Sequence, residues 1–170
     1  ELRLASWVER ILFAGIHSTD RLVRRRQLFT NIAAYVMAAT ALAHFVGIAI
    51  HDFKGYLIVH AYHVLIFFFC VLNHRLHAYG NRVAAITLII GVALGHIFVM
   101  FAFGTASDLQ FYFALAVFIF FILGVENLRV CLTLYAACFV ALLVALAFVP
   151  ADGFVLPADA ELRRSLADQA

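Results

Sequence analysis

The sequence predicts an all-α integral membrane protein. The expected fold is a bundle of five transmembrane helices, with a sixth in the natural chain, preceded by an amphipathic interfacial helix. Of the 170 residues, 66% are hydrophobic and 13% are charged, against roughly 25% charged residues in soluble domains. Five apolar stretches reach the length of about 20 residues that a membrane span requires. No segment shows the alternating polarity of a transmembrane β-barrel strand.

Residues 1–26 form the first predicted unit. In the segment LRLASWVERILFAGI, apolar side chains recur at helical spacing, while Arg3, Arg10 and His17 lie on another face. Such a helix, with Trp7 on its apolar side, suits the headgroup region of a membrane or the surface of a partner protein. The basic run RLVRRR then leads into the first span.

The second predicted unit is the transmembrane bundle of residues 27–150, and the third is a polar tail, 151–170, leading toward the sixth span. The five spans are expected at 28–50, 55–73, 83–103, 109–125 and 130–149. The turn HDFKG is so short that spans one and two must be antiparallel neighbours. The arginines at the other ends of the spans indicate, by the positive-inside rule, that the N-terminus is cytoplasmic. These arginines are Arg21, Arg24, Arg25, Arg26, Arg75, Arg82 and Arg129.

Most other residue types give little sign of chemistry. The three cysteines, Cys70, Cys131 and Cys138, fall within spans without CxxC spacing, which is typical of small packing residues. Glu126, at the cytoplasmic end of span four, is expected to form a surface ion pair. The sequence contains no Ser/His/Asp set at matched depth, no Gly-rich phosphate loop and no acidic pair for Mg²⁺. We therefore predict no catalytic site in this chain and no nucleic-acid partner.

Four of the eight histidines fall at similar depth in the outer half of the membrane. From the helix rise, His44 lies about 9 Å below the outer end of its span, His60 and His63 lie about 8 and 12 Å deep, and His96 about 10 Å. Intramembrane ionisable residues are rare and usually functional. His60 and His63 share one helical face, so His44 and His96 would supply the opposing ligands.

These imidazoles suit a metal centre, because imidazole ligates haem iron, copper and zinc. No carboxylate or thiolate joins them at their depth, which favours b-type haem held by two imidazoles, although copper stays open. We expect three glycines beside them to leave room for a large flat group, with aromatic walls around it. The glycines are Gly47, Gly91 and Gly95, and the aromatic residues are Phe45, Tyr62, Phe67 and Phe98.

A second haem is a further hypothesis. His74 and His77 each follow His60 and His63 by fourteen residues, about 21 Å along a helix. An inner haem would need His17 as a partner. The alternative, which we favour, is that His74 and His77 are polar residues at a helix end.

Several motifs together resemble the six-helix membrane anchor of bacterial class III adenylate cyclases, including the mycobacterial type. They are RRRQLFTNIAAY, LNHRLHAYGN, GTASDLQFYFALAVFIFFILGVENLRV and LLVALAFVPADG. The resemblance covers roughly residues 24–157, and it implies a bacterial inner-membrane location, a sixth span and a cytoplasmic cyclase domain that works as a homodimer. His44, His60, His63 and His96 make the chain similar to a second group of such anchors. That group has a tetra-histidine signature, binds haem b and responds to the quinone pool.

We therefore expect a membrane anchor that holds one or two b-type haems and relays the redox state of quinone to a cyclase domain. Three alternatives remain. The chain is a non-redox receptor for a lipid, a quinone or a metal ion; a plain anchor that dimerises through spans four and five; or a cytochrome b-type electron-transfer subunit.

Overall fold

The computed structural model describes residues 6–105, 116–151 and 153, and every regular element among them is helical. Four of the helices are long and apolar enough to cross a membrane. This confirms the predicted all-α membrane bundle. The elements are α1 (Ser6–Leu12), α2 (Arg21–Asp52), α3 (Leu57–Leu72), the 3-10 helix η1 (Asn73–Tyr79), α4 (Asn81–Phe103), α5 (Ile119–Leu123), the 3-10 turn η4 (Val125–Asn127) and α6 (Leu128–Phe148).

Four predicted spans correspond to α2, α3, α4 and α6. The predicted span 109–125 falls partly outside the described residues, and its described part contains α5. Most of the predicted tail, 151–170, also lies outside them. The second span continues further than expected, because η1 extends the helix of α3 as far as Tyr79. Gly80, at φ +126°, then ends it in a conformation that favours glycine.

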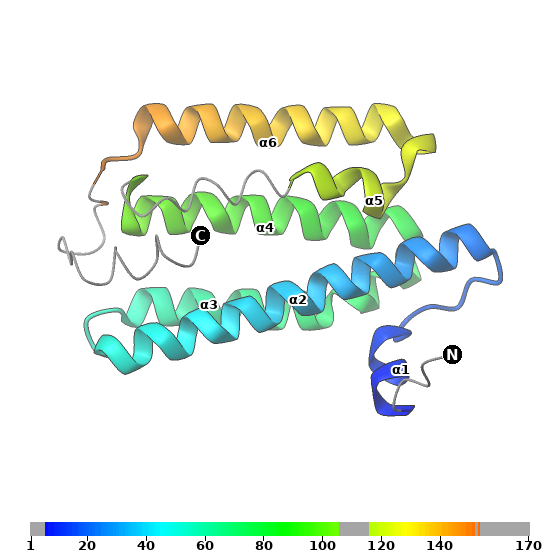
Figure 1. The fold of residues 1–170 in the computed structure, drawn as a ribbon, viewed down its shortest axis with the longest axis horizontal. Coiled ribbons are helices and arrows are strands. Elements are labelled where there is room, and N and C mark those ends of the chain that lie inside the picture. Colours follow the sequence, from blue (N-terminus) through cyan, green and yellow to red (C-terminus); the bar gives the residue numbers. More distant parts are fainter. Residues whose placement is uncertain (1–5, 106–115, 152, 154–170) are drawn as a thin grey trace.

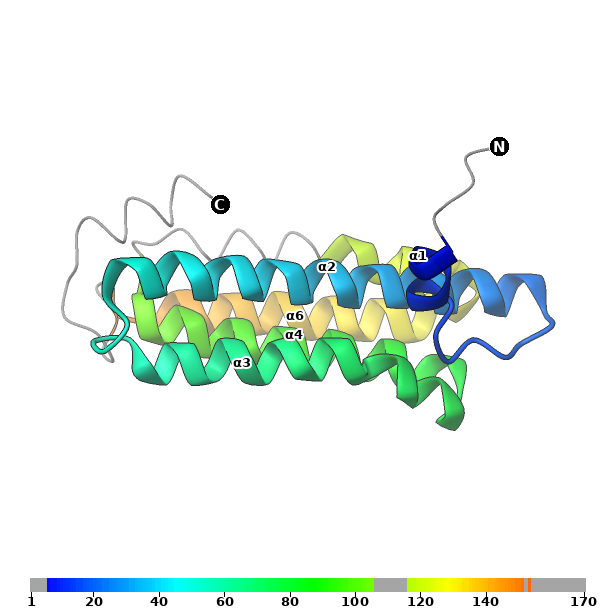
Figure 2. The same cartoon turned by 90° about the horizontal axis from the view of Figure 1, so that it is seen from below.

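The long helices run side by side with alternating directions (Figures 1 and 2). The closest pair is α2 with α3, and α4 lies between this pair and α6, in contact with all three. At one end of the bundle lie the start of α2, η1, the start of α4, and the turn before α6 together with the start of α6. We call it the arginine end, because these segments contain the arginines named above. The other is the opposite end.

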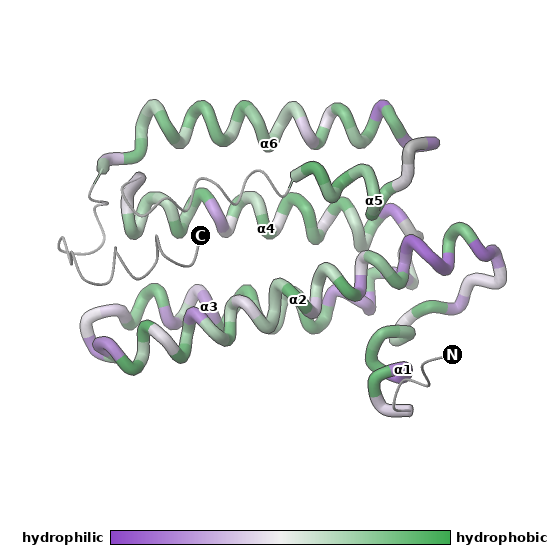
Figure 3. Tube along the Cα trace, viewed as in Figure 1, coloured by the Kyte–Doolittle hydropathy of each residue, from purple (hydrophilic) through white to green (hydrophobic). Residues whose placement is uncertain are grey.

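Hydropathy follows the geometry of a membrane protein (Figure 3), with hydrophilic segments concentrated at the arginine end, especially at the start of α2. Large apolar side chains on the bundle surface are exposed, as they would be toward lipid; Ile50 is 81% exposed and Leu65 69%. A helix of 32 residues such as α2 is about 48 Å long, whereas the hydrocarbon layer is about 30 Å thick. The first turns of α2 therefore extend beyond the hydrocarbon.

Local hydrogen bonds fix both ends of α2. Its N-cap is Asp20, whose carboxylate accepts from the backbone N–H groups of Leu22 and Val23 at 2.8 and 3.2 Å, satisfying donors that have no partner inside the helix. At the other end, Asp52 accepts from the N–H groups of Lys54 and Gly55, both at 3.0 Å. That turn reverses the chain into α3, as the short HDFKG segment predicts.

The N-terminal helix α1 is shorter than the predicted segment and ends at Leu12. Its axis lies across the bundle axis at the arginine end (Figures 1 and 2). Trp7 is 62% exposed and no residue of α1 is buried. A helix at the membrane interface would have this orientation, and the interfacial location of α1 stays a prediction.

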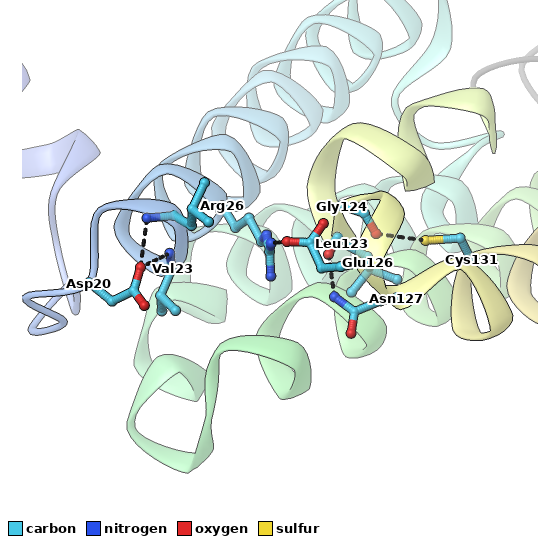
Figure 4. Close-up of polar contacts among 9 residues, drawn as sticks. Asp20, Val23, Arg26, Leu123, Gly124, Glu126, Asn127 and Cys131 are labelled. Atoms are coloured by element: carbon cyan, nitrogen blue, oxygen red, sulfur yellow. Dashed lines mark hydrogen bonds and ion pairs between the residues drawn. The ribbon is translucent and has the colours of Figure 1, made fainter.

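A polar cluster ties α2 to the turn before α6 (Figure 4). Arg26 of α2 forms an ion pair with Glu126, so the ion pair predicted for Glu126 exists, with its partner on another helix. Gly124 lies at φ +80°, and a Cβ there would meet both side chains of that pair. The Asn127 amide donates to the Leu123 carbonyl at 2.6 Å. A glycine at position 124 therefore lets the ion pair close over the turn.

Candidate functional site

A small cavity lies between α2, α3 and α4. Its volume is about 70 Å³. Three of the four intramembrane histidines line it, one from each helix: His44, His63 and His96. The other lining residues are mostly apolar, namely Met37, Thr40, Ala41, Ile48, Tyr62, Ile66, Val92, Val99 and Phe103. The fold thus brings together histidines that are as much as 52 residues apart in the sequence.

The pair His44 and His63 is the best-defined part of the cavity. Their ring centroids are 6.0 Å apart, with an interplanar angle of 48°. His63 is 5% exposed, and its Nδ1–H donates to the Val59 carbonyl at 2.8 Å. Because the carbonyl can only accept, the neutral ring has its lone pair on Nε2. A backbone bond of this kind orients a metal-binding histidine and fixes its tautomer.

The third histidine of the cavity, His96, comes from α4, as the depth argument predicts. Its neighbour Gly95 faces the cavity residue Tyr62, and a Cβ at position 95 would lie 2.5 Å from the Tyr62 hydroxyl oxygen. Tyr62 also packs against Phe98, with ring centroids 5.0 Å apart. One aromatic pair therefore joins α3 to α4 next to His96.

His60 does not line the cavity. It is 2% exposed, stacks on Phe53 at 4.8 Å and meets Phe45 edge-on at 5.0 Å. Within the described part of the chain, neither of its ring nitrogens has a hydrogen-bond partner. His60 therefore lies outside the cavity that His44, His63 and His96 line in this arrangement, and a site shared by all four histidines stays a prediction. His60 lies one helical turn before His63 and therefore contacts aromatic residues close to the loop between α2 and α3.

The remaining candidates, His17, His74 and His77, have separate environments at the arginine end. His17 is exposed between α1 and α2. His74 bonds through Nδ1 to the Val71 carbonyl at 2.9 Å, and His77 donates from Nε2 to the Asn31 side-chain oxygen at 2.9 Å. These contacts fit the helix-end alternative, and no ring contact pairs His17 with either of the other two among the described residues.

The expectation that three glycines make room for a flat ligand is wrong at two of them. A Cβ at Gly91 would collide with the Phe69 ring, and one at Gly95 would collide with Tyr62. Both glycines instead admit an aromatic side chain from α3. Only Gly47 faces open space, with no atom within 4 Å of its would-be Cβ, and it is exposed on the bundle surface.

The size of the cavity limits what it holds in this arrangement. A water molecule needs about 10 to 15 Å³ of such space, and a cavity of about 150 Å³ holds benzene. The cavity therefore has room for a few waters or an ion, and a tetrapyrrole requires the helices to move apart. Among the described residues, no group of three or more His, Cys, Asp or Glu side chains is arranged to hold a metal ion. The arrangement offers two imidazoles, with a third beside them.

Sequence reasoning also passed over several polar residues. Thr40, which is half-buried, lines the cavity and donates its hydroxyl to the Val36 carbonyl at 3.0 Å. Gln27, Asn31 and Asn73 are at most 5% exposed near the arginine end. Their position inside apolar spans was a signal, since a buried polar side chain in a membrane helix demands a partner.

Comparison with known proteins gives one match. A model of the MASE7 family, which comprises membrane-associated sensor domains, matches residues 17–165. No curated protein and no solved structure is similar enough to match. The matched region contains all the long helices and every histidine discussed above. The chain therefore belongs to the MASE7 family of membrane-associated sensor domains.

Proposed function

We propose that this membrane sensor domain binds b-type haem through imidazoles of the cavity. The haem would report the redox state of the quinone pool to a cytoplasmic adenylate cyclase domain in the same natural chain. The sensor would act as a homodimer in the bacterial inner membrane, with its N-terminus in the cytoplasm. The observation that supports this most is the convergence of His44, His63 and His96 from three helices on one cavity.

The donor set fits the iron of a b-type haem. His63 keeps Nε2 available because Nδ1 is bonded to Val59. Two nitrogens bound to one metal ion lie at most about 4 Å apart, twice a metal–nitrogen bond of about 2 Å. Ring centroids 6.0 Å apart are compatible with that spacing. His44 and His63 would therefore hold the iron, with His96 as the alternative partner of His63 and His60 as the least favoured ligand.

Haem binding requires more space than the cavity has in this structure. With about 70 Å³, the cavity admits the haem only if α2 or α4 moves away from α3. When bound, haem supplies one-electron redox chemistry. The residues of the chain orient the ligands, through the Val59 carbonyl, and exclude water, through Ile48, Ile66 and Val99. A change of one charge in a low-dielectric site is large enough to bias helix positions.

The test is an absorbance spectrum of the protein purified after haem-replete expression, oxidised and then reduced with dithionite. A Soret band, with narrow α and β bands on reduction, is expected for six-coordinate b-type haem. His63→Ala should lose most of the haem, while the matched variant His74→Ala, at the arginine end, should retain it. A featureless wild-type spectrum would remove the haem proposal, and haem retention in His63→Ala would remove the ligand assignment.

The small volume of the cavity favours one second candidate, a non-redox receptor for a transition-metal ion. Two or three neutral imidazoles suit Cu²⁺, Zn²⁺ or Ni²⁺, and an ion needs no separation of the helices. Colourless protein that binds one equivalent of Cu²⁺ or Zn²⁺ in calorimetry, and loses it in His63→Ala, would support this candidate. Absence of both haem and metal would leave the plain dimerising anchor. Co-purification with a dehydrogenase would indicate a cytochrome b-type electron-transfer subunit.

A further inference from the structure

The interface between α2 and the continuous α3–η1 helix contains two polar contacts at different levels. We call this interface the α2–α3 seam. His44 meets His63 at the cavity, and Asn31 meets His77 at the arginine end. Thirteen residues separate the two positions on α2, and fourteen separate those on α3–η1, so both contacts lie on one antiparallel interface about 20 Å apart.

Small side chains lie between these two levels, in a buried cluster that also includes Leu88 of α4 and has larger, half-buried apolar residues around it. Ala34 and Ala38 of α2 form one cluster of buried residues with Cys70 of α3. Ala38 is 3% exposed and Cys70 is fully buried. Small side chains let two helices approach closely in a membrane. The separation of α2 and α3 at this level is therefore set by van der Waals contact, and a larger side chain would force the helices apart.

Asn31 uses its whole amide group in contacts with two other segments. Its Nδ2 donates to the carbonyls of Leu12 and Ala14 at 2.8 and 3.0 Å, and its Oδ1 accepts from His77 Nε2 at 2.9 Å. The residue is 1% exposed. These bonds fix the orientation of the amide, because only the oxygen can accept from His77 and only the nitrogen can donate to the carbonyls. One side chain of α2 thus holds η1 and the end of α1 together.

The attachment of α1 depends on such contacts, because none of its own residues is buried. Two further contacts accompany the bonds of Asn31. Gly15, at φ +72°, packs its backbone against the His74 carbonyl, where a Cβ would collide. The Arg24 guanidinium lies over the Phe13 ring, 5.0 Å from its centroid. Val8 and Leu12 are only half-buried, so the two backbone carbonyls bound by Asn31 are an important restraint on α1.

We propose that Asn31 is a positioning residue that locks α1 to the α2–α3 seam, and that the lock opens when α2 and α3–η1 separate. Asn31 reaches His77 and the carbonyls of Leu12 and Ala14 together only while the two helices are in contact. Separation breaks the bond to His77 and frees the amide to turn. The interfacial helix α1 then leaves the bundle, so that the state of the seam is transmitted to the membrane surface at the arginine end.

The first experiment measures hydrogen exchange of the backbone amides of residues 6–16 by mass spectrometry, on the protein in lipid nanodiscs. Asn31→Asp keeps an acceptor for His77 but loses both bonds to α1. Exchange in α1 should accelerate on the order of tenfold, the factor expected for two hydrogen bonds of ordinary net strength. Asn31→Ala, which introduces no charge, should give the same acceleration.

The matched control is Asn127→Ala, because Asn127 is a buried asparagine whose amide bonds only within its own region, to Leu123. Exchange in α1 should equal that of the wild type in this variant. Wild-type exchange in both Asn31 variants, with their helical content intact by circular dichroism, would overturn the lock.

The second experiment separates the helices without any ligand. Ala38→Leu places a larger side chain in the seam, and exchange in α1 should accelerate about fivefold as the overpacked helices move apart. Ala39→Leu makes the same change on the exposed face of the same helix and should have no effect. Ala38→Val is the milder substitution if the leucine variant does not fold. Unchanged exchange in the folded Ala38 variant would overturn the coupling between the seam and α1.

Discussion

Glycines in the middle of this bundle have different roles that depend on what faces them. Gly91 is opposite the Phe69 ring and Gly95 is opposite Tyr62, so each lets an aromatic side chain of α3 reach α4. Gly47 faces nothing within 4 Å. The same residue type therefore serves helix packing at two positions and has no packing role at the third.

This difference predicts opposite effects of one substitution. Gly91→Ala should destabilise the folded protein by about 1 to 3 kcal/mol, because its Cβ overlaps a packed ring. Gly47→Ala should be neutral or stabilise by up to about 1 kcal/mol, since alanine favours the helix and meets no neighbour. Unfolding in sodium dodecyl sulfate, followed by circular dichroism, measures both. Equal stability of the two variants would contradict the assigned roles.

Besides packing along their lengths, the helices are linked by polar contacts at their ends. The Arg26–Glu126 ion pair joins the first turns of α2 to the turn before α6 (Figure 4). The side chain of Arg26 is 17% exposed and that of Glu126 is 49% exposed, so water screens the pair only in part. Nearby, the Cys131 thiol donates to the Gly124 carbonyl at 3.6 Å. This contact keeps α6 close to the same turn.

The ion pair should therefore contribute a small but measurable coupling between these elements. A double-mutant cycle with Arg26→Gln and Glu126→Gln should give a coupling free energy of about 0.5 to 1 kcal/mol. High salt should reduce it. In the control cycle, Arg25→Gln replaces Arg26→Gln; Arg25 lies over the Phe29 ring, and its effect should add to that of Glu126→Gln. Strict additivity in the first cycle would show that the pair contributes nothing to stability.

In the molecule as a whole, most of the polar contacts between helices described above lie at the arginine end. This end contains the lock at Asn31, the ion pair of Arg26 and the crosswise helix α1, whereas the described residues of the opposite end include the short turn between α2 and α3. The histidine cavity lies among α2, α3 and α4. Those same helices continue to the arginine end, so a change at the cavity has a direct mechanical route to it.

The orientation of α1 gives a prediction about membrane depth. Trp7 is the single tryptophan of the chain and is 62% exposed, so its fluorescence reports on α1 alone. In bilayers of brominated lipids, quenching should be strongest when the bromines lie just below the headgroups, because tryptophan at an interfacial helix occupies that level. Strongest quenching by deep bromines, or none at all, would exclude a helix at the interface.

The membrane class and the positions of four spans were predictable from the amino-acid sequence alone. These features depend on local composition and on the constant rise of a helix, so no tertiary information is needed. The turn HDFKG likewise predicted where the chain reverses between spans one and two. His44 and His96 also line the cavity of His63, from neighbouring helices, while their role as ligands stays a prediction.

The rotation of each helix about its own axis, and hence which neighbouring helix each side chain contacts, depends on the tertiary structure. Depth along a span does not state which neighbour a side chain faces, and so His60 was expected in the cavity although it packs between Phe45 and Phe53. The same holds for Asn31, which contacts segments 17 and 46 residues away. Whether a glycine leaves a space or contacts an aromatic ring also depends on the opposite helix. The rotation and packing of helices are set by long-range contacts, so the sequence of a single span does not predict them.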